Sequence, residues 1–394
     1  MRILMSTWGW RSHFYCLAPL GWALQAAGHE VRVASQPALA GTITAAGLAA
    51  VPLGADLDFA EAFAEKIREV GRLDADTDAG DPGSGDQVEP AITADGGVVR
   101  FAEALLDELV DYGAEYRPDL MIWEPFNLAA ATAAAVLDVP GVLQLWGPDS
   151  SVTLRLDRQA VLGPLAGQYG LAGTEVELAG RLTLNPVPEP MQVPLTGASR
   201  DVRFVPYNGP AVLPGWLRQP ADRPRVCVTA GTMMAGAGLT DRLALPRIIQ
   251  AVAALDVEVV VVLERSQQAG LGALPANVRL ADAPLALRLL LPSCAALVQQ
   301  GGAGTTMTAL ACGVPQLVLP QVSDQHFNAE RLALTGAGTT LVGEQVEAGR
   351  IGELVGELVA GECWRSAAAR MAERVRAMPA PAELVADLVG LAAG

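Results

Sequence analysis

The sequence predicts an α/β protein made of two doubly wound domains, each with a parallel β-sheet covered by helices. Three observations support this prediction. Short apolar strand patterns alternate with helical patterns along the chain, which is typical of parallel sheets. The alternation stops at a proline-rich stretch, residues 206–224, and then starts again. The chain of 394 residues is long for one domain and sufficient for two, each with its own core.

The first strand–helix–strand unit lies at the start of the chain. Residues 2–6 have a strand pattern, apolar side chains from Leu17 to Ala27 share one helical face, and Gly28 ends that helix before a strand at residues 31–34. This order predicts a parallel pair of strands. Further strands are expected at residues 119–123, 142–146, 225–229, 258–263, 296–298 and 316–319, and further helices at residues 127–136, 241–254 and 304–312.

The proline-rich stretch divides the chain. We expect an N-terminal domain at residues 1–205, a linker at 206–224, a C-terminal domain at 225–380, and a C-terminal helix at 381–394 that could pack back on the first domain. A ligand of such a protein lies outside the carboxyl ends of the strands, so we expect it between the domains. The acidic, glycine-rich residues 74–86 have no period and predict a mobile loop, with residues 73–89 as a flap over the acceptor.

Composition excludes several classes of protein. The net charge of −16 argues against a nucleic-acid or anionic-membrane surface. No apolar run approaches the roughly 20 residues of a membrane helix, and the first residues lack a signal-peptide pattern. We therefore expect a cytoplasmic protein. The five cysteines are scattered without a close pair, which favours free thiols and no metal site.

The strongest motif is a glycine-rich turn between a strand and a helix, at residues 298–306. Gly301, Gly302 and Gly304 would let the backbone come close to a ligand. The helix that follows offers free N–H groups and the positive end of its dipole, which together suit a diphosphate. The alternative is a tight turn that needs glycine only for its backbone conformation.

The same residues nearly match the dinucleotide motif G-x-G-x-x-G, so an oxidoreductase is an alternative. Gly302 and Gly304 fit that motif, and Asp324 lies 20 residues beyond Gly304. Against it, Met307 replaces the third small residue and the motif lies deep in the chain. Asp324 also follows a further strand and the turn at Pro320.

The segment 299–313, followed by Val314-Pro315-Gln316 and by residues 324–329, resembles the donor signature of actinobacterial natural-product glycosyltransferases of the GT-B fold. Their usual form is H-H-G-G-A-G-T, then G-V-P, then D-Q-x-x-N-A. The resemblance covers nearly the whole chain and is strongest to enzymes that attach TDP-deoxysugars to polyketides. It also includes Ser12-His13, Trp123-Glu124-Pro125, Gly147-Pro148-Asp149 and Ala230-Gly231-Thr232.

The resemblance implies an inverting transfer of a sugar, by direct displacement, from a TDP- or UDP-linked donor to a hydrophobic acceptor such as a polyketide. It implies no metal and no cofactor, since amides at the helix start would hold the diphosphate. A homodimer or an auxiliary activator protein is a possible partner. The sequence does not distinguish O- from C-glycoside formation. An epimerase of sugar nucleotides and a non-catalytic partner protein of the same fold are the alternatives.

Two residues are candidates for the catalytic pair. His13 follows the first strand and opens a helix, whose N-terminus disfavours a charged imidazole. By resemblance His13 is the general base, and its alternative role is a capping or solvated histidine. Glu124 ends a strand of the same sheet. By resemblance it orients the base, and its alternative is an ordinary strand-end glutamate.

The resemblance also assigns the binding residues. Gln299 and Gln300 replace the usual histidine pair, and glutamine donates a hydrogen bond but carries no charge. We expect Gln299 to face the diphosphate and to hold it more weakly. Asp324 could instead cap a helix that starts near Phe327. The expected contacts are Gly231, Thr232, Gln299, Gln300, Gly301, Gly302, Gly304 and Thr305 for the diphosphate, Asp324 and Gln325 for the sugar, and Trp8, Trp10, Phe14, Phe59, Phe63 and Trp146 for the acceptor.

Overall fold

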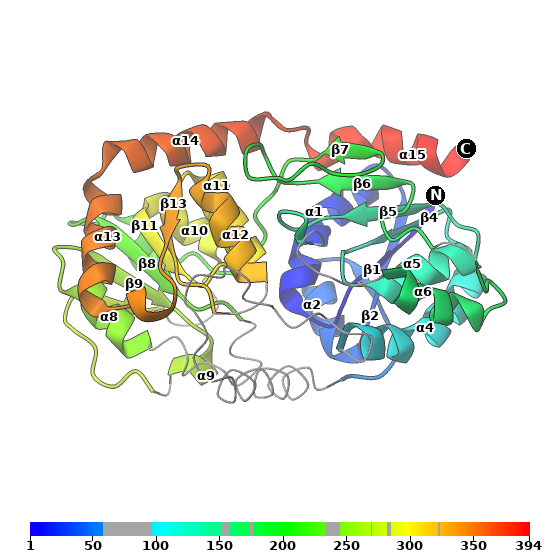
Figure 1. The fold of residues 1–394 in the computed structure, drawn as a ribbon, viewed down its shortest axis with the longest axis horizontal. Helices are drawn as coiled ribbons and strands as arrows, with labels where there is room; N and C mark the ends of the chain where they lie inside the picture. Colours follow the sequence, from blue (N-terminus) through cyan, green and yellow to red (C-terminus); the bar gives the residue numbers. More distant parts are fainter. Residues whose placement is uncertain are drawn as a thin grey trace, which may run out of the picture.

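The computed structural model of the chain describes residues 1–57, 97–150, 158–173, 176–232, 245–268, 270–281, 285–321 and 324–394. Two α/β domains lie side by side, each built on one parallel sheet (Figure 1). The predicted fold class is therefore confirmed. The expected flap at residues 73–89 lies outside the described residues.

The N-terminal sheet has seven strands in the order β3-β2-β1-β4-β5-β6-β7, all parallel. The strands are β1 (Arg2–Ser6), β2 (Glu30–Ser35), β3 (Ala49–Pro52), β4 (Leu120–Trp123), β5 (Gly141–Gln144), β6 (Leu182–Asn185) and β7 (Ser199–Asp201). The helices of this domain are α1 (Arg11–Ala26), α2 (Ala40–Ala45), α4 (Gly97–Tyr116), α5 (Leu128–Val136) and α6 (Arg158–Gly167).

The C-terminal sheet has six parallel strands in the order β10-β9-β8-β11-β12-β13. The strands are β8 (Arg225–Thr229), β9 (Glu258–Val262), β10 (Val278–Leu280), β11 (Cys294–Gln299), β12 (Gln316–Val318) and β13 (Gly338–Thr340). The helices are α8 (Leu245–Ala253), α9 (Arg265–Gln268), α10 (Leu287–Leu290), α11 (Ala303–Cys312), α12 (Asp324–Ala333), α13 (Ala348–Ala360), α14 (Glu362–Ala377) and α15 (Val385–Ala393).

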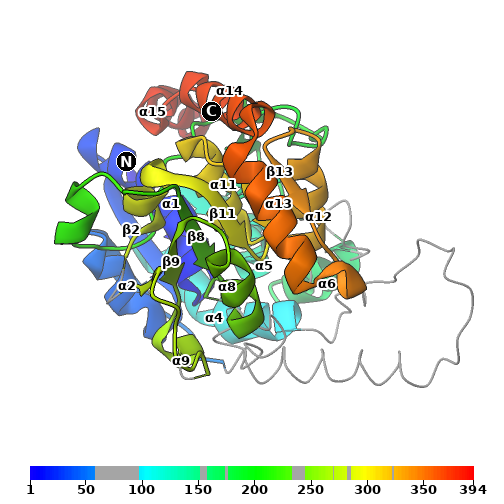
Figure 2. The ribbon, with the colours of Figure 1, turned by 90° about the vertical axis from the view of Figure 1, so that its left-hand side faces the viewer.

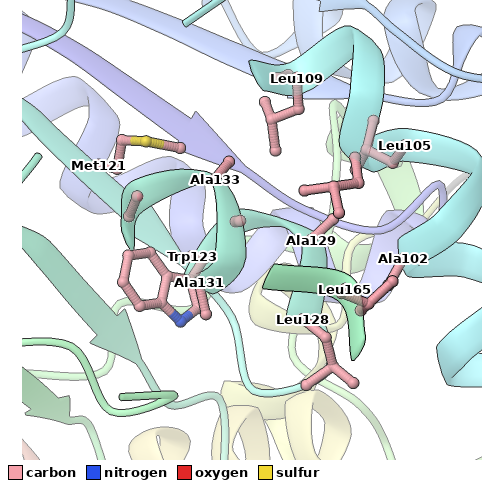
Figure 3. Packing of buried hydrophobic residues seen from close by; sticks show 14 of the residues in the cluster. Ala102, Leu105, Leu109, Met121, Trp123, Leu128, Ala129, Ala131, Ala133 and Leu165 are labelled. Atoms are coloured by element: carbon pink, nitrogen blue, oxygen red, sulfur yellow. The ribbon is translucent and has the colours of Figure 1, made fainter. Parts of the chain in front are cut away.

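Both faces of each sheet are covered, which explains the short, continuous apolar runs of the strands. In β1, Leu4 belongs to one hydrophobic cluster, whereas Ile3 and Met5 belong to the cluster on the opposite face. Successive strand residues point to opposite faces, so both sets of side chains are buried. Figure 3 shows residues of the first cluster, with the Trp123 ring beside Ala131 of α5 and with Leu105 and Leu109 of α4 farther to the right.

The strand order reverses once in each sheet, and these reversals place the candidate residues. In the N-terminal sheet the chain builds outward from β1 through β2 and β3, then returns to place β4 on the other side of β1. In the C-terminal sheet β8 and β11 have the same relation. A crevice forms where such neighbours send their connections to opposite faces. The loops after β1, β4, β8 and β11 therefore carry the expected site.

The C-terminal segment returns to the N-terminal domain. Figures 1 and 2 show α14 running over the top of the molecule and α15 lying on the first domain. Leu384 and Leu388 are buried with Ile3 and Met5 of β1 in one cluster. The end of the chain thus completes the core of its beginning.

Some details differ from the sequence prediction. Helix α12 begins at Asp324, not near Phe327, so the motif forms the first turn of the helix. Helix α5 begins at Leu128, and Asn127 caps it, its side chain accepting a hydrogen bond from the Ala130 N–H at 3.1 Å. All five cysteines are free thiols. Within the described ranges, no helix is long and apolar enough to cross a membrane.

The packing of the C-terminal segment gives a test of stability. Leu388→Ala removes a fully buried side chain, and such a change destabilises a protein by about 2–5 kcal/mol. The control Leu334→Ala changes a leucine that is 62% exposed, and it should alter stability by less than about 0.5 kcal/mol. Chemical denaturation measures both. Equal stability of the two variants would contradict the packing of α15 on the first domain.

Candidate active site

Glu124 is fixed at the carboxyl end of β4 by backbone amides. Its carboxylate accepts hydrogen bonds from the Phe126 N–H at 2.8 Å and the Trp8 N–H at 3.3 Å, and its side chain is 1% exposed. A buried carboxylate needs such donors. Asn127 secures the same loop, because its side-chain amide donates to the Ser6 hydroxyl at 2.8 Å. The ends of β1 and β4 are thereby joined around Glu124.

His13 lies in the first turn of α1 with its ring toward Glu124. Its Nδ1 atom is 3.3 Å from the Glu124 Oε1 atom, and the side chain is 12% exposed. The Nδ1 atom is buried. Because the ring is not aligned for a direct hydrogen bond to Glu124, Nδ1 has no hydrogen-bond partner among the described residues. The sequence prediction that these two residues lie together agrees with this geometry.

Aromatic rings surround His13. The Trp8 ring stacks on it with centroids 5.6 Å apart and planes within 4°, and the Trp146 ring lies 4.4 Å away. Trp10 and Phe126 complete the group, with ring centroids at 5.8 and 6.1 Å. These neighbours leave the imidazole little freedom to turn. The sequence analysis missed Phe126, although its place two residues after Glu124 could have indicated it.

One expectation for the acceptor site changes, and two other acceptor candidates lie outside the described residues. Phe14 is fully buried in the core beneath α1, together with Leu17 and Leu24, so its assignment to the acceptor was wrong. It lies three residues before Leu17 and thus shares the core face of the helix. Phe59 and Phe63 lie outside the described residues. Trp8 and Trp146 are mostly buried, while Trp10 is half-buried.

The glycine-rich turn joins β11 to α11. Gly301 has a φ of +100°, and a Cβ there would lie 2.8 Å from the Gln325 carbonyl oxygen. Its glycine is therefore required by backbone conformation and by close packing on α12. At Gly304 a Cβ would meet no atom within 4 Å, so this position is open. Gly304 and Thr305 lie in the first turn of α11, where backbone N–H groups have no partner within the helix.

The two glutamines before this turn have different roles. Gln299 points into the domain: its side-chain amide donates to Thr306 Oγ1 at 3.0 Å and Gln316 Oε1 at 3.1 Å, and its Oε1 accepts from the Gly301 N–H at 2.7 Å. The expectation that Gln299 faces the diphosphate does not fit this arrangement, because the side chain braces the turn from inside.

Gln300 lies between two turns that contain glycine: the turn at Gly231 after β8 and the turn at Gly302 after β11. A Cβ on Gly231 would lie 2.1 Å from its Nε2 atom, and a Cβ on Gly302 would lie 2.9 Å from it. The Gln300 Oε1 atom is buried and has no hydrogen-bond partner in the described part of the chain. Gln300 therefore adjoins both turns expected to hold a diphosphate. Thr232, next to Gly231, is exposed.

Asp324 and Asn328 connect α12 to the same turn. Asn328 donates through its side-chain amide to the Gly301 carbonyl at 2.9 Å and to Asp324 Oδ2 at 3.1 Å. Gln325 is 1% exposed, and its Oε1 accepts from the Gln321 N–H at 3.0 Å. Asn328, which the sequence analysis did not single out, thus connects Asp324, the candidate for sugar binding, to the glycine-rich turn, the candidate for diphosphate binding.

The two halves of the site meet across the domain interface. Gly147 approaches the start of α11 so closely that a Cβ on it would lie 2.7 Å from the Ala303 Cβ. Burial raises the pKa of Asp324, while the Asn328 hydrogen bond and the positive charge of a protonated His13 oppose this rise. This influence of His13 on Asp324 indicates that these two residues of different domains lie near each other. Among the described residues, no cluster of His, Cys, Asp and Glu could hold a metal ion.

Comparisons with known proteins match the chain over its full length. The family described as "Erythromycin biosynthesis protein CIII-like" matches with its N-terminal domain at residues 22–231 and its C-terminal domain at residues 246–391. The TDP-daunosamine transferase DnrS of Streptomyces peucetius is 37% identical, covering 100% of this chain and 97% of the relative. The 10-deoxymethynolide desosaminyltransferase of Streptomyces venezuelae is 35% identical, with 100% and 97% coverage.

Solved structures give the same result. The spinosyn forosaminyltransferase SpnP has a TM-score of 0.83 and 31% identity, with 100% of both chains covered. The glycosyltransferase VinC in complex with dTDP has a TM-score of 0.80 and 32% identity, again with 100% of both chains covered.

The raised pKa of Asp324 gives a prediction of pH-dependent stability. A carboxyl whose pKa is higher in the folded than in the unfolded state destabilises the fold when it ionises. Asp324→Asn should therefore raise the melting temperature at about pH 7.5. The gain should shrink as the pH falls toward 3.8, the ordinary pKa of the group. Thermal unfolding at several pH values measures this.

A surface carboxylate provides the control for this measurement. Asp256 is 88% exposed, so Asp256→Asn should leave the melting temperature nearly unchanged at every pH. A lower melting temperature of Asp324→Asn at neutral pH would contradict the cost of burying this carboxylate.

Proposed function

The chain belongs to the erythromycin biosynthesis protein CIII-like family of glycosyltransferases, and on this basis we propose that it transfers a deoxysugar, with inversion, from a TDP-sugar to a hydroxyl group of a polyketide. The observation that carries the proposal is the His13–Glu124 pair, whose histidine lies on α1, a helix that contacts α11 across the domain interface. Relatives named as TDP-sugar and polyketide transferases support the substrate classes.

The proposed donor site uses backbone amides. The diphosphate lies at the start of α11, near Gly302, Gly304 and Thr305, where free N–H groups and the helix dipole stabilise negative charge. Gly231 and Gln300 line it from the end of β8 and β11. Asp324 binds hydroxyl groups of the sugar, held in place by Asn328. The solved relative with bound dTDP supports a thymidine nucleotide.

The proposed reaction is a single displacement. The acceptor oxygen attacks the anomeric carbon, the bond from this carbon to the diphosphate oxygen breaks, and the nucleotide diphosphate leaves with the bonding electrons. His13 accepts the acceptor proton at Nε2, because Nδ1 faces Glu124. The Glu124 carboxylate then stabilises the imidazolium. One displacement on one face inverts the anomeric configuration.

The alternatives have less support. An epimerase acts on a sugar nucleotide alone and needs no acceptor site beside the base, whereas aromatic rings line the surroundings of His13. A non-catalytic partner protein would have no need for the pair of His13 and Glu124, which the chain retains. Transfer to carbon instead of oxygen would show as a product whose sugar resists acid hydrolysis.

The catalytic pair provides the test of the proposed function. The purified protein should transfer sugar from a TDP-deoxysugar to a polyketide alcohol, and His13→Ala should lower kcat by about 10²- to 10⁴-fold, the usual contribution of a general base. Binding of TDP, measured by calorimetry, should stay within about 2-fold of wild type, since the donor contacts lie in the other domain. Glu124→Gln should lower kcat by a smaller factor than His13→Ala does, because the base is retained.

Two outcomes would oppose this assignment. Full activity of His13→Ala on an alcohol acceptor would exclude the base, and absence of any transfer by the wild-type protein across TDP-deoxysugars and polyketides would exclude the proposed function. Phe14→Leu serves as the control, because Phe14 packs in the core beside His13 without facing the cleft.

The glutamine pair gives a second prediction. Gln300→His should tighten TDP binding by about 2- to 5-fold at pH 6, where imidazolium forms, since a favourable charge near a phosphate contributes about 0.5–1 kcal/mol. The matched variant Gln299→His should not tighten binding, because Gln299 lies inside the domain in three hydrogen bonds. Calorimetric titration at about pH 6 and 8 distinguishes them. Tighter binding by Gln299→His alone would reverse the assignment.

A further inference from the structure

Arg331 joins the donor side of the site to the N-terminal domain. It lies on α12 and is half-buried. Its Nε atom donates to the Met191 carbonyl at 2.9 Å, and its Nη2 atom donates to the carbonyls of Pro190 at 2.5 Å and Gln192 at 2.8 Å. One guanidinium therefore holds three successive carbonyl groups of the segment between β6 and β7. Hydrogen bonds from a charged donor are stronger than neutral ones.

The held segment continues to the acceptor side. Gln192 accepts a hydrogen bond at its Oε1 atom from the Asp149 N–H at 2.9 Å, and its Nε2 atom donates to Asn185 Oδ1 at 2.7 Å. Asp149 follows Trp146 by three residues, and the Trp146 ring lies 4.4 Å from the His13 ring. These contacts connect residues 190–192 to a neighbour of the base.

The same helix carries the donor residues. Asn328 and Arg331 are three residues apart, and Asp324 is four residues before Asn328, so all three lie along one side of α12. The packing beneath Arg331 is continuous across the interface, where Met191 is buried in one cluster with Ala329 and Leu332. Helix α12 thus has a fixed place against the first domain at its second half and presents Asp324 at its start.

We propose that Arg331 is a positioning residue for sugar transfer: it sets the place of α12, and so of the donor sugar, relative to the segment 146–149 and to His13. The inference rests on the proposed function. A base and a bound sugar that belong to different domains are productive only in one relative placement. Misplacement by about 1 Å can reduce a rate about 10²-fold. Arg331 itself does not touch the reacting atoms.

The variants Arg331→Ala, Arg331→Gln and Arg331→Lys test this role. Arg331→Ala should lower kcat for transfer by about 10- to 100-fold, while the Kd of TDP changes by less than about 2-fold. Hydrolysis of the TDP-sugar should rise relative to transfer, because water still reaches a donor whose acceptor is misplaced. Arg331→Lys should recover part of kcat, since an ammonium can donate to some of the three carbonyls.

Arg203→Ala is the matched control. Arg203 is also half-buried, and its Nε atom donates to a distant backbone carbonyl, that of Met378, at 3.0 Å. This contact lies just beyond the end of α14 and involves none of the three carbonyl groups that Arg331 holds. The control should lose stability without changing the ratio of hydrolysis to transfer.

Hydrogen exchange gives a readout that does not depend on activity. The Asp149 amide, which is bonded to Gln192, should exchange at least about 10-fold faster in Arg331→Ala and unchanged in Arg203→Ala. If the wild-type protein transfers no sugar, the proposed function falls, and this exchange still decides whether Arg331 holds the segment. The inference is overturned if exchange at Asp149 is unchanged, or if kcat falls equally in both alanine variants at equal loss of stability. Should Arg331→Ala fail to fold, Arg331→Gln and Arg331→Lys provide the same comparison.

Discussion

The reversal of strand order in each parallel sheet is the constraint on which the site depends. A parallel strand sends every connection out at its carboxyl end, and the connections of β1 and β4 lie on opposite faces of the sheet. His13 and Glu124 come together for this reason, although more than a hundred residues separate them in the chain. The same relation between β8 and β11 brings Gly231 beside Gln300. Each domain thus contributes one crevice, and the chemistry requires that both face the same space.

Under the proposed function, local dipoles and not the overall charge would hold the anionic donor. The chain carries a net charge of −16, which repels a diphosphate at long range. Backbone amides at the start of α11 act within a few ångströms, where the overall field matters little. The acidic groups inside the site are also held by neutral N–H donors: Glu124 by two backbone amides and Asp324 by the Asn328 side chain. A neutral Gln300 is consistent with a site that relies on dipoles.

The sequence predicts eight of the thirteen described strands, because a strand buried on both faces has an apolar pattern that solvent-exposed segments lack. It does not predict β3, β6, β7, β10 and β13. It also places His13, Glu124 and the glycine turn, since Glu124 and the turn follow directly after such strands and His13 opens the helix after β1. It does not show which way a side chain points at the end of a strand, so Gln299 was placed in the cleft when it lies inside. The sequence likewise does not show which way Phe14 points from its helix, so Phe14 was assigned to the acceptor when it lies in the core. Arg331 carries no motif, and its partners are about 140 residues away in the chain.

Two kinds of polar contact connect the domains: an exposed ion pair and hydrogen bonds from Arg331 to backbone carbonyls. Arg11 and Glu264 form an ion pair across it at 3.1 Å, but their side chains are 48% and 36% exposed. Exposed ion pairs contribute about 0–1 kcal/mol and weaken with salt. Arg331 instead donates to neutral carbonyls that are packed beside an apolar cluster. Such bonds do not depend on the ionisation of a partner, and water competes for them less. We therefore expect the hydrogen bonds of Arg331 to contribute more to the relative placement of the domains than this exposed ion pair.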